Sequence, residues 1–297
     1  MIKPNIPLKR RSPVETSQLI SRSIIKKFRP TIWSRFTRAV KDYQLVKEGD
    51  RIAVCISGGK DSMLLAKCME QLQRYSQVPF SVEYLVMDPG YAPANRALIE
   101  ENLNTLGIKA HIVESDIFAA VTEVDSNPCY LCARMRRGHL YHYARELGCN
   151  KIALGHHFDD VIETVLMTML YSGQIRSMLP KLHSTNFPGM KLIRPLYPVR
   201  QEDIIAWRDY NHLRFLQCAC KLTEKAAVDE SASKRKETAR IIERLKQDNP
   251  FVEINIFKSM HNVHMDTVIE YTAKGERHSF LDDYDATQAE SGRGKED

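Results

Sequence analysis

A short apolar run that breaks at two glycines and continues as a helical pattern constrains the fold more than any other stretch of the chain. Residues Ile52–Ile56 are apolar and rich in β-branched side chains, which is typical of a buried parallel strand. Gly58 and Gly59 end this run, and apolar residues then recur at helical spacing from Leu64 to Leu72. A strand that enters a helix through a glycine turn directs backbone N–H groups and the positive end of the helix dipole at one point. The sequence therefore predicts an anion site here, above all a phosphate site.

Strand-like and helix-like segments alternate along most of the chain. This alternation predicts an α/β fold with a doubly wound parallel sheet, in which ligands bind beyond the carboxyl ends of the strands. After Gly173 the pattern loosens. The expected strands are 52–56, 80–87, 109–113, 151–154 and 214–217, and the expected helices are 31–43, 61–75, 94–106, 133–147, 161–171 and 201–210.

Charge and composition divide the chain of 297 residues into four expected parts. Residues 1–30 are basic and weakly patterned and are expected to form a flexible arm, and residues 31–220 form the catalytic domain. A charged helical extension over 221–281 and a disordered acidic tail over 282–297 follow. Residues 1–47 carry a net charge of +10, against +6 for the whole chain. Such a basic arm indicates contact with a nucleic-acid backbone, and a solvated leader without a partner is the alternative.

The sequence gives no indication of a membrane protein. No uninterrupted apolar run approaches the length of a membrane span, and Lys9, Arg10 and Arg11 interrupt any signal-peptide core. We therefore expect a cytoplasmic protein with no membrane partner.

Four of the seven cysteines form two close pairs, Cys129-x-x-Cys132 and Cys218-x-Cys220. Paired thiols in a reducing compartment indicate metal or redox chemistry rather than disulfides. The first pair lies just before an expected helix, in which residues 134–137 include three arginines. Both the helix dipole and the arginines favour thiolate. A zinc site built from all four cysteines and an iron–sulfur cluster are both compatible with these pairs.

Polar residues follow the first expected strand at the proposed anion site. Lys60 can place a cation on phosphates. Asp61 and Ser62 begin the helix, so they can serve the ligand, cap the helix, or do both. The spacing differs from that of the G-x-x-x-x-G-K-[ST] and G-x-G-x-x-G loops. A tight turn without a ligand is the alternative reading of this loop.

Further polar residues follow the second and fourth expected strands. Asp88 ends the second strand, and Gly155 and His156 follow the fourth. Asp159 and Asp160 then open the next helix. Carboxylates at this place can hold Mg²⁺ against ATP or can simply cap the helix.

The loop Ser57–Ser62 (SGGKDS) resembles the SGGxDS signature of the PP-loop ATP pyrophosphatases, which cleave ATP between the α- and β-phosphates and transfer AMP to an oxygen. Over about residues 33–265 the chain is similar to one branch of that group, the tRNA 2-thiocytidine synthetases, which share the PP-loop with lysidine synthetase. The basic arm and the acidic tail lie outside this similarity. The other motifs that carry it are Pro128–Gly138, Gly155–Asp160, Pro180–Leu182, Arg194–Leu196 and Met260–Val263.

The resemblance implies a PP-loop (HUP-like) fold and a reaction. ATP would adenylate the C2 oxygen of cytidine 32 in the tRNA anticodon loop with loss of pyrophosphate, after which sulfur attacks C2 and AMP leaves. The expected ATP-binding residues are Ser57, Gly58, Gly59, Lys60, Asp61, Ser62, Asp88, Gly155 and His156, with Lys60, Asp61 and Asp160 in catalysis and Mg²⁺ accompanying ATP.

The resemblance also implies an iron–sulfur cofactor. Family members hold an oxygen-sensitive 4Fe–4S cluster on three cysteines, which leaves one iron open to carry the sulfur. Cys129 and Cys132 match two of these positions. The third lies in a Pro-Cys-x-x-Cys in the family, whereas this chain has Gln217-Cys218-Ala219-Cys220, so Cys218 is favoured by position and Cys220 competes with it. Zinc is the alternative metal.

The implied partners are tRNA and a sulfur donor, either a cysteine desulfurase or sulfide, and a homodimer remains an open alternative. A PP-loop enzyme that thiolates another tRNA base or makes lysidine is the nearest alternative. Lysidine synthesis needs no cluster, so Cys129 and Cys132 count against it. A zinc-stabilised nucleotide- or RNA-binding module without turnover is an alternative of another class. It would release no pyrophosphate from ATP in the presence of tRNA.

Overall fold

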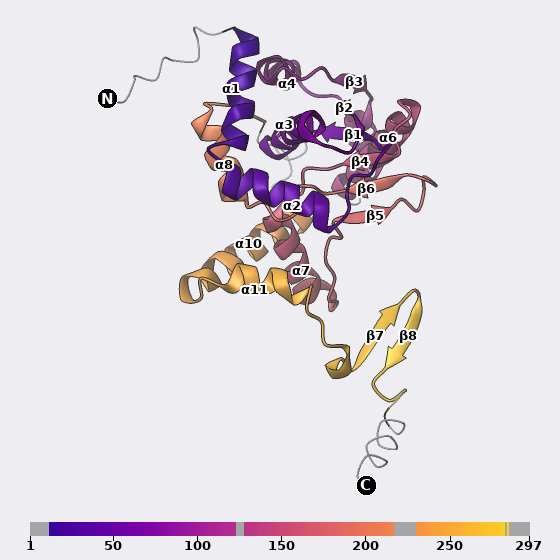
Figure 1. The fold of residues 1–297 in the computed structure, drawn as a ribbon. Helices are drawn as coiled ribbons and strands as arrows, with labels where there is room; N and C mark the ends of the chain where they lie inside the picture. Colours follow the sequence, from indigo (N-terminus) through magenta and orange to yellow (C-terminus); the bar gives the residue numbers. More distant parts are fainter. Residues whose placement is uncertain (1–11, 123–127, 217–229, 283, 285–297) are drawn as a thin grey trace, which may run out of the picture.

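A six-stranded sheet forms the centre of the molecule, and helices cover both of its faces (Figure 1). The computed structural model describes residues 12–122, 128–216, 230–282 and 284. All neighbouring strands of this sheet run parallel except the last pair, β6 and β5, so the predicted doubly wound parallel sheet is confirmed. In spatial order the strands are β3 (His111–Glu114), β2 (Ser81–Asp88), β1 (Arg51–Ile56), β4 (Lys151–Ala153), β6 (Lys191–Ile193) and β5 (Lys181–His183).

The central strand β1 is buried on both faces because its side chains alternate between two apolar layers. Ile52 and Val54 face the layer made with α1 (Pro13–Ile25), α2 (Ser34–Asp42), α3 (Lys60–Tyr75), α4 (Pro93–Leu106) and α8 (Gln201–Tyr210). Ala53 and Cys55 face the layer made with α6 (Pro128–Glu146). The almost entirely apolar sequence of β1 thus follows from its central position in the sheet.

The order of the strands places the site. From β1 the chain continues to β2 and then β3 on one side, whereas β4 lies on the other side of β1. In open α/β sheets the crevice at such a reversal is where ligands bind. The loops after β1 and β4 flank it, and both carry motifs from the sequence.

The expected arm over residues 1–30 is wrong for residues 13–30. Helix α1 begins with a capping box in which Glu15 N–H donates to Ser12 Oγ and Ser12 N–H donates to Glu15. Ile20 and Ile24 are fully buried in the main core, and a π-helical turn (Arg29–Trp33) then leads into α2. Basic residues on both sides concealed this helix, because the helix itself carries only Glu15 and Arg22 as charged residues. Residues 1–11 lie outside the described part of the chain.

Two expected element boundaries also need correction. Helix α6 begins at Pro128, so Cys129 and Cys132 lie in its first turns and not in a preceding loop. Of the expected strand 214–217, residues 214–216 belong to no strand, and residue 217 lies outside the described part of the chain. They are held by other contacts, in which Leu216 N–H donates to Gly58 O (3.2 Å) and Asn102 Nδ2 donates to Arg214 O (2.8 Å).

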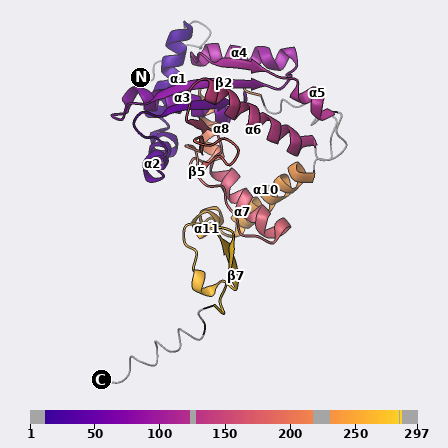
Figure 2. The same cartoon turned by 90° about the vertical axis from the view of Figure 1, so that its right-hand side faces the viewer.

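The C-terminal part packs around α7 (Phe158–Ser172), which points away from the sheet (Figures 1 and 2). Ile242 of α10 (Glu230–Asp248) packs with Phe158 and Ile162 of α7, and α11 (Val252–Ser259) joins this small core. A hairpin of β7 (Glu270–Ala273) and β8 (Glu276–Ser279) follows, so the predicted extension is not helical throughout.

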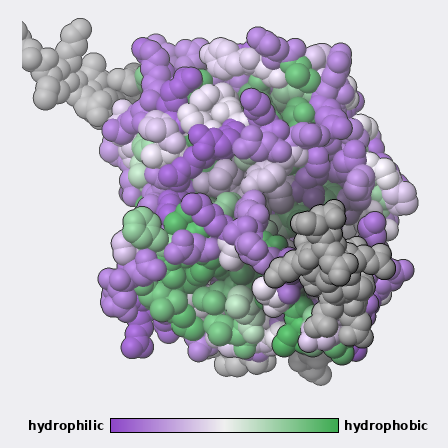
Figure 3. All heavy atoms as spheres, turned by 60° about the horizontal axis from the view of Figure 1, so that its bottom comes forward, coloured by the Kyte–Doolittle hydropathy of each residue, from purple (hydrophilic) through white to green (hydrophobic). Residues whose placement is uncertain are grey.

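This end of the molecule exposes apolar surface. Figure 3 looks at it from below Figure 1 and shows apolar regions among hydrophilic ones. No helix in the described ranges combines the length and the apolar character that crossing a membrane requires. The large exposed apolar residues from the end of α7 and from the C-terminal segment include Met169, Leu170, Ile175, Val263, Met265, Ile269, Phe280 and Leu281.

Candidate active site

The loop between β1 and α3 closes on itself. Gly58 has a φ of +84°, and a Cβ added there would lie 2.8 Å from Ile99 Cγ1, so the turn requires glycine at this position. Ser62 Oγ accepts a hydrogen bond from Ser57 N–H (3.1 Å) and donates one to Gly59 O (3.0 Å). These contacts hold the loop in one shape at the N-terminus of α3.

Among the described residues, no side chain caps the N-terminus of α3. Its N-cap is Gly59, so neither Asp61 nor Ser62 serves as the capping residue. A Cβ on Gly59 would meet nothing nearer than 3.7 Å, which leaves room in front of the uncapped N–H groups. Lys60 follows at once, and its Nζ lies 3.0 Å from Asp61 Oδ1. Uncapped N–H groups, a helix dipole and an ammonium group together suit a phosphate.

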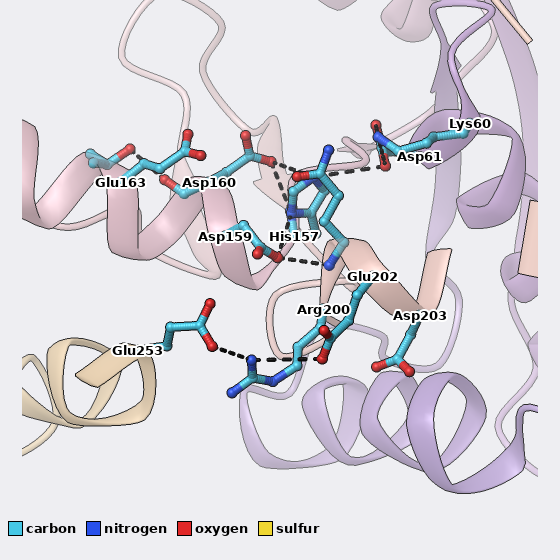
Figure 4. Close-up of polar contacts among 12 residues, drawn as sticks. Lys60, Asp61, His157, Asp159, Asp160, Glu163, Arg200, Glu202, Asp203 and Glu253 are labelled. Atoms are coloured by element: carbon cyan, nitrogen blue, oxygen red, sulfur yellow. Dashed lines mark hydrogen bonds and ion pairs between the residues drawn. The ribbon is translucent and has the colours of Figure 1, made fainter. Parts of the chain in front are cut away.

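The loop after β4 lies directly against this helix start. A Cβ on Gly155 would come within 3.0 Å of Asp61 C and Ser62 N, so the close approach of the two loops depends on this glycine. His157 is buried, and its Nε2 lies 3.7 Å from Asp61 Oδ1 and 3.6 Å from Asp160 Oδ2 (Figure 4). The structure therefore brings the two sequence motifs together around one imidazole.

Asp159 and Asp160 have different partners. Asp159 Oδ2 accepts a hydrogen bond from Gln201 N–H at 2.7 Å, which ties α7 to the start of α8. Asp160 Oδ2 accepts from His157 N–H at 3.0 Å. Burial works against protonation of His157, but the surrounding carboxylates outweigh it and raise its pKa. Both carboxylates thus organise the start of the helix, and Asp160 also lies against the same imidazole nitrogen, His157 Nε2, that Asp61 contacts.

Two further residues of this cluster were not found from the sequence. Arg235 of α10 lies with Nη1 3.3 Å from Asp160 Oδ1 and Nε 3.6 Å from Glu163 Oε2. Burial raises the pKa of Glu163 to about 7, while Arg235 opposes that shift. The i,i+3 spacing of Asp160 and Glu163 was visible in the sequence. No sequence signal indicated that Arg235, 75 residues after Asp160, would join them.

Asp88 lies at the end of β2, where the sequence placed it, but its carboxylate is engaged within its own loop. Oδ1 accepts hydrogen bonds from Gly90 N–H (2.9 Å) and Tyr91 N–H (2.7 Å), and Oδ2 accepts one from Arg96 Nη1 (2.6 Å). Burial raises its pKa, but these hydrogen bonds outweigh burial, so the pKa is lowered. Asp88 therefore shapes the turn that follows β2.

His156 is neutral at pH 7 in this environment. Burial, followed by the charge of Arg194, lowers its pKa to about 4. Burial also lowers the pKa of Arg194 to about 10, with Arg137 adding to the effect. His156 Nδ1 and Arg194 Nε are buried and have no hydrogen-bond partner among the described residues. The sequence motifs of both residues thus lie at the same site.

Helix α6, which carries the first cysteine pair, contacts the glycine loop through a tyrosine. Tyr91 Oη donates to Ser57 O (3.4 Å), and Arg136 Nη2 lies 3.5 Å from Tyr91 Oη. Cys132 is buried, with 7% of its surface exposed, in an apolar cluster that includes Met87. The side chain of Cys129, and the whole of Cys218 and Cys220, lie outside the described residues. Leu216, the last described residue before the second cysteine pair in the sequence, contacts Gly58 as described above.

Within the described ranges, no group of three or more His, Cys, Asp or Glu side chains is arranged to hold a metal ion. Asp61 Oδ1 is buried and forms ion pairs with Lys60 Nζ (3.0 Å) and His157 Nε2 (3.7 Å), but it accepts no hydrogen bond of good geometry from the described residues. The oxygen ligands of Asp61 and Asp160 fit the preference of Mg²⁺, which commonly binds one or two carboxylates together with phosphate oxygens.

Comparison with known proteins agrees with this geometry. The model of a family described as the PP-loop domain matches residues 29–224. A tRNA-cytidine(32) 2-sulfurtransferase of Geotalea uraniireducens is 38% identical over 236 residues, which is 78% of this chain and 91% of that protein. The enzyme of the same name from Pelobacter propionicus is 33% identical over 80% of this chain and 87% of that protein.

Among solved structures, the U34-tRNA thiolase NcsA from Methanococcus maripaludis, solved with its [4Fe-4S] cluster, superimposes with a TM-score of 0.62. The match covers 80% of each chain at 21% sequence identity, which supports the fold. The family match and the two relatives show that the chain belongs to the PP-loop family and, within it, to the tRNA-cytidine(32) 2-sulfurtransferases.

Proposed function

We propose that this chain is an AMP-forming tRNA sulfurtransferase that converts cytidine 32 of the anticodon loop to 2-thiocytidine. One observation carries the proposal. The uncapped start of α3, with Lys60 and Asp61, faces Asp160 across a glycine contact at the reversal of the sheet, in a chain 38% identical to an enzyme of that name.

The first step is adenylation of the base. The N–H groups at the start of α3 and the ammonium group of Lys60 bind the phosphates of ATP. The C2 oxygen of cytidine attacks the α-phosphorus, the α–β phosphoanhydride bond breaks, and pyrophosphate leaves. Asp61 and Asp160 would hold Mg²⁺, which would neutralise phosphate charge. Gly155 is needed because any side chain there would separate Asp61 from the second loop.

The second step is sulfur transfer. Sulfur attacks C2, the C2–O bond breaks, and AMP leaves with that oxygen. We infer that Cys129, Cys132 and Cys218 hold a 4Fe–4S cluster, with Cys220 as the competing third ligand. The cluster, when bound, supplies a place where sulfur can be held for transfer. The buried thiol of Cys132 fits this group because thiolates are its usual ligands.

Nucleoside mass spectrometry of tRNA tests the function. A strain lacking the gene should lose 2-thiocytidine, and a plasmid copy should restore it. In vitro, pyrophosphate release from ATP should depend on tRNA. Loss of a different thiolated nucleoside or of lysidine would reassign the target, and no tRNA-dependent pyrophosphate would indicate a binding module without turnover.

We also propose that basic residues before α1 contact tRNA phosphates. Removing residues 1–11 deletes Lys3, Lys9, Arg10 and Arg11. We expect weaker tRNA binding, with the slope of log K against log salt reduced by roughly 0.7–0.9 for each phosphate that the shortened protein no longer neutralises. The measurement is a binding titration at several salt concentrations.

The truncation must stop before α1. Removal of residues 1–30 would also take away Ile20, Ile24 and Phe28, each of which contributes about 1.5–3 kcal/mol when buried, so folding itself would be lost. The protein lacking residues 1–11 should unfold at the same temperature as the full chain. If its salt slope is also unchanged, those four charges do not contact tRNA phosphates.

A further inference from the structure

A side chain from the C-terminal helices, that of Arg235, reaches the proposed nucleotide site. It comes from α10, whereas the carboxylates that it contacts, Asp160 and Glu163, lie on successive turns of α7 (Figure 4 shows the two carboxylates). Asp61 completes the acidic side of the site from α3, through His157. Arg235 therefore connects α10 to the carboxylates of α7, a contact that nothing in the sequence indicates.

The contact uses a particular oxygen. Asp160 Oδ2 is engaged by His157 N–H at 3.0 Å, within the same loop. Arg235 Nη1 contacts the other oxygen, Oδ1, at 3.3 Å. The oxygen that the loop leaves available to an incoming cation is thus the one that the guanidinium already occupies.

The ion pair contributes little to the attachment of α10. The Arg235 side chain is 44% exposed, and its Nε contact with Glu163 is 3.6 Å long. Partly exposed pairs at such distances contribute little to the stability of a folded protein. The extension is fastened elsewhere, by Ile242 in the α7 core and by the contact between Arg200 Nη1 and the buried Glu253 at 2.5 Å. Arg235 can leave Asp160 without releasing the helix.

We propose that Arg235 is a positioning residue that occupies Asp160 in the nucleotide-free protein and gives it up to the divalent cation that arrives with ATP. The guanidinium and the cation compete for one carboxylate oxygen, and the competition is reciprocal. Loading of the nucleotide site is thereby transmitted to α10, the helix that follows the segment carrying Cys218 and Cys220. The inference rests on the ATP site of the proposed function and is independent of tRNA thiolation.

The test compares binding of one nucleotide with and without metal. The probe is AMPCPP, whose α–β bridging carbon prevents cleavage, and its affinity is measured calorimetrically with saturating Mn²⁺ and with EDTA, both without tRNA. The quantity compared is the ratio of the affinity with Mn²⁺ to the affinity with EDTA. In Arg235→Gln we expect this ratio to rise roughly three- to tenfold, because the guanidinium no longer competes with the metal for Asp160. Arg235→Lys should return the ratio toward that of the unmodified protein.

Arg240→Gln is the matched control, since Arg240 lies on the same helix and is exposed. It removes the same charge and should leave the ratio within twofold. A purely structural role for Arg235 would weaken both forms equally, and that result would overturn the inference. So would an unchanged ratio, a ratio shifted equally by Arg240→Gln, or no stimulation of binding by Mn²⁺. None of these outcomes bears on whether tRNA is thiolated.

Discussion

Replacing Lys60 with alanine is expected to reduce tRNA-dependent pyrophosphate release by roughly 10²–10³-fold, the usual cost of removing one electrostatic contact to a charge that develops in the transition state. Lys60 begins α3, and its side chain is only 18% exposed beside Asp61, so its ammonium group is held at the uncapped helix start. Shortening the side chain removes that charge without opening the core. The rate of pyrophosphate release and the thermal unfolding temperature should be measured together.

Gly59→Val should be at least as harmful, for a different reason. Among the described residues, a Cβ on Gly59 would meet only Ser57 Oγ at 3.7 Å and Leu216 O at 3.8 Å, so the Cβ itself is tolerated, whereas the methyl groups of valine would occupy the place of a phosphate. Lys109→Ala is the matched control for Lys60→Ala, because Lys109 is exposed and precedes β3 at the opposite edge of the sheet. Near-normal activity in a folded Lys60→Ala protein would show that this loop is not the ATP site.

Serine at Cys129, Cys132 or Cys218 is expected to abolish both the visible absorbance of the cluster and thiolation, whereas Cys220→Ser should retain both. Sulfur transfer needs three thiolates and one iron position without a protein ligand. A structural zinc site would instead use all four cysteines. The four variants should be purified and reconstituted without oxygen, and iron, zinc and visible absorbance then measured.

Cys149→Ala serves as the control for loss of a thiol as such, since Cys149 is buried beside β4 in the apolar layer under α6. It should bind iron normally. If Cys220→Ser loses the cluster while Cys218→Ser keeps it, the third ligand is Cys220. Zinc without bindable iron, lost equally in all four serine variants, would make this a Cys₄ structural site and exclude the proposed cofactor.

The local parts of the site could be predicted from the sequence, because each is formed by residues that are close along the chain. A buried strand, a glycine at φ +84° and a helix start are specified within residues 52–66, and the structure places them as expected. The loop from Gly155 to Asp160 follows the same logic. Parallel strands then bring the two loops to one edge, since the alternation of strands and helices determines where carboxyl ends lie.

The features that could not be predicted from the sequence depend on contacts between segments that are distant along the chain. Residues 13–25 lie between two groups of basic residues and look like part of an arm, yet apolar side chains of α1 meet the core and hold the helix in place. Helical propensity alone is a weak guide for such a segment, because tertiary packing supplies most of the stability of a short helix. The absence of a strand over 214–216 has the same origin, since hydrogen bonds to Gly58 and from Asn102 replace strand pairing.

The sequence by itself determined the parallel sheet and the residues that stand at its ligand-binding edge, because backbone conformation and burial follow from neighbouring residues. Only the tertiary structure decided the partners of those residues. It assigned Asp159 to the start of α8, enclosed Asp88 in its own turn, and brought Arg235 to Asp160. Ion pairs and hydrogen bonds act over a few ångströms in space, irrespective of separation along the chain, so the pairing of these groups is settled only when the helices have packed.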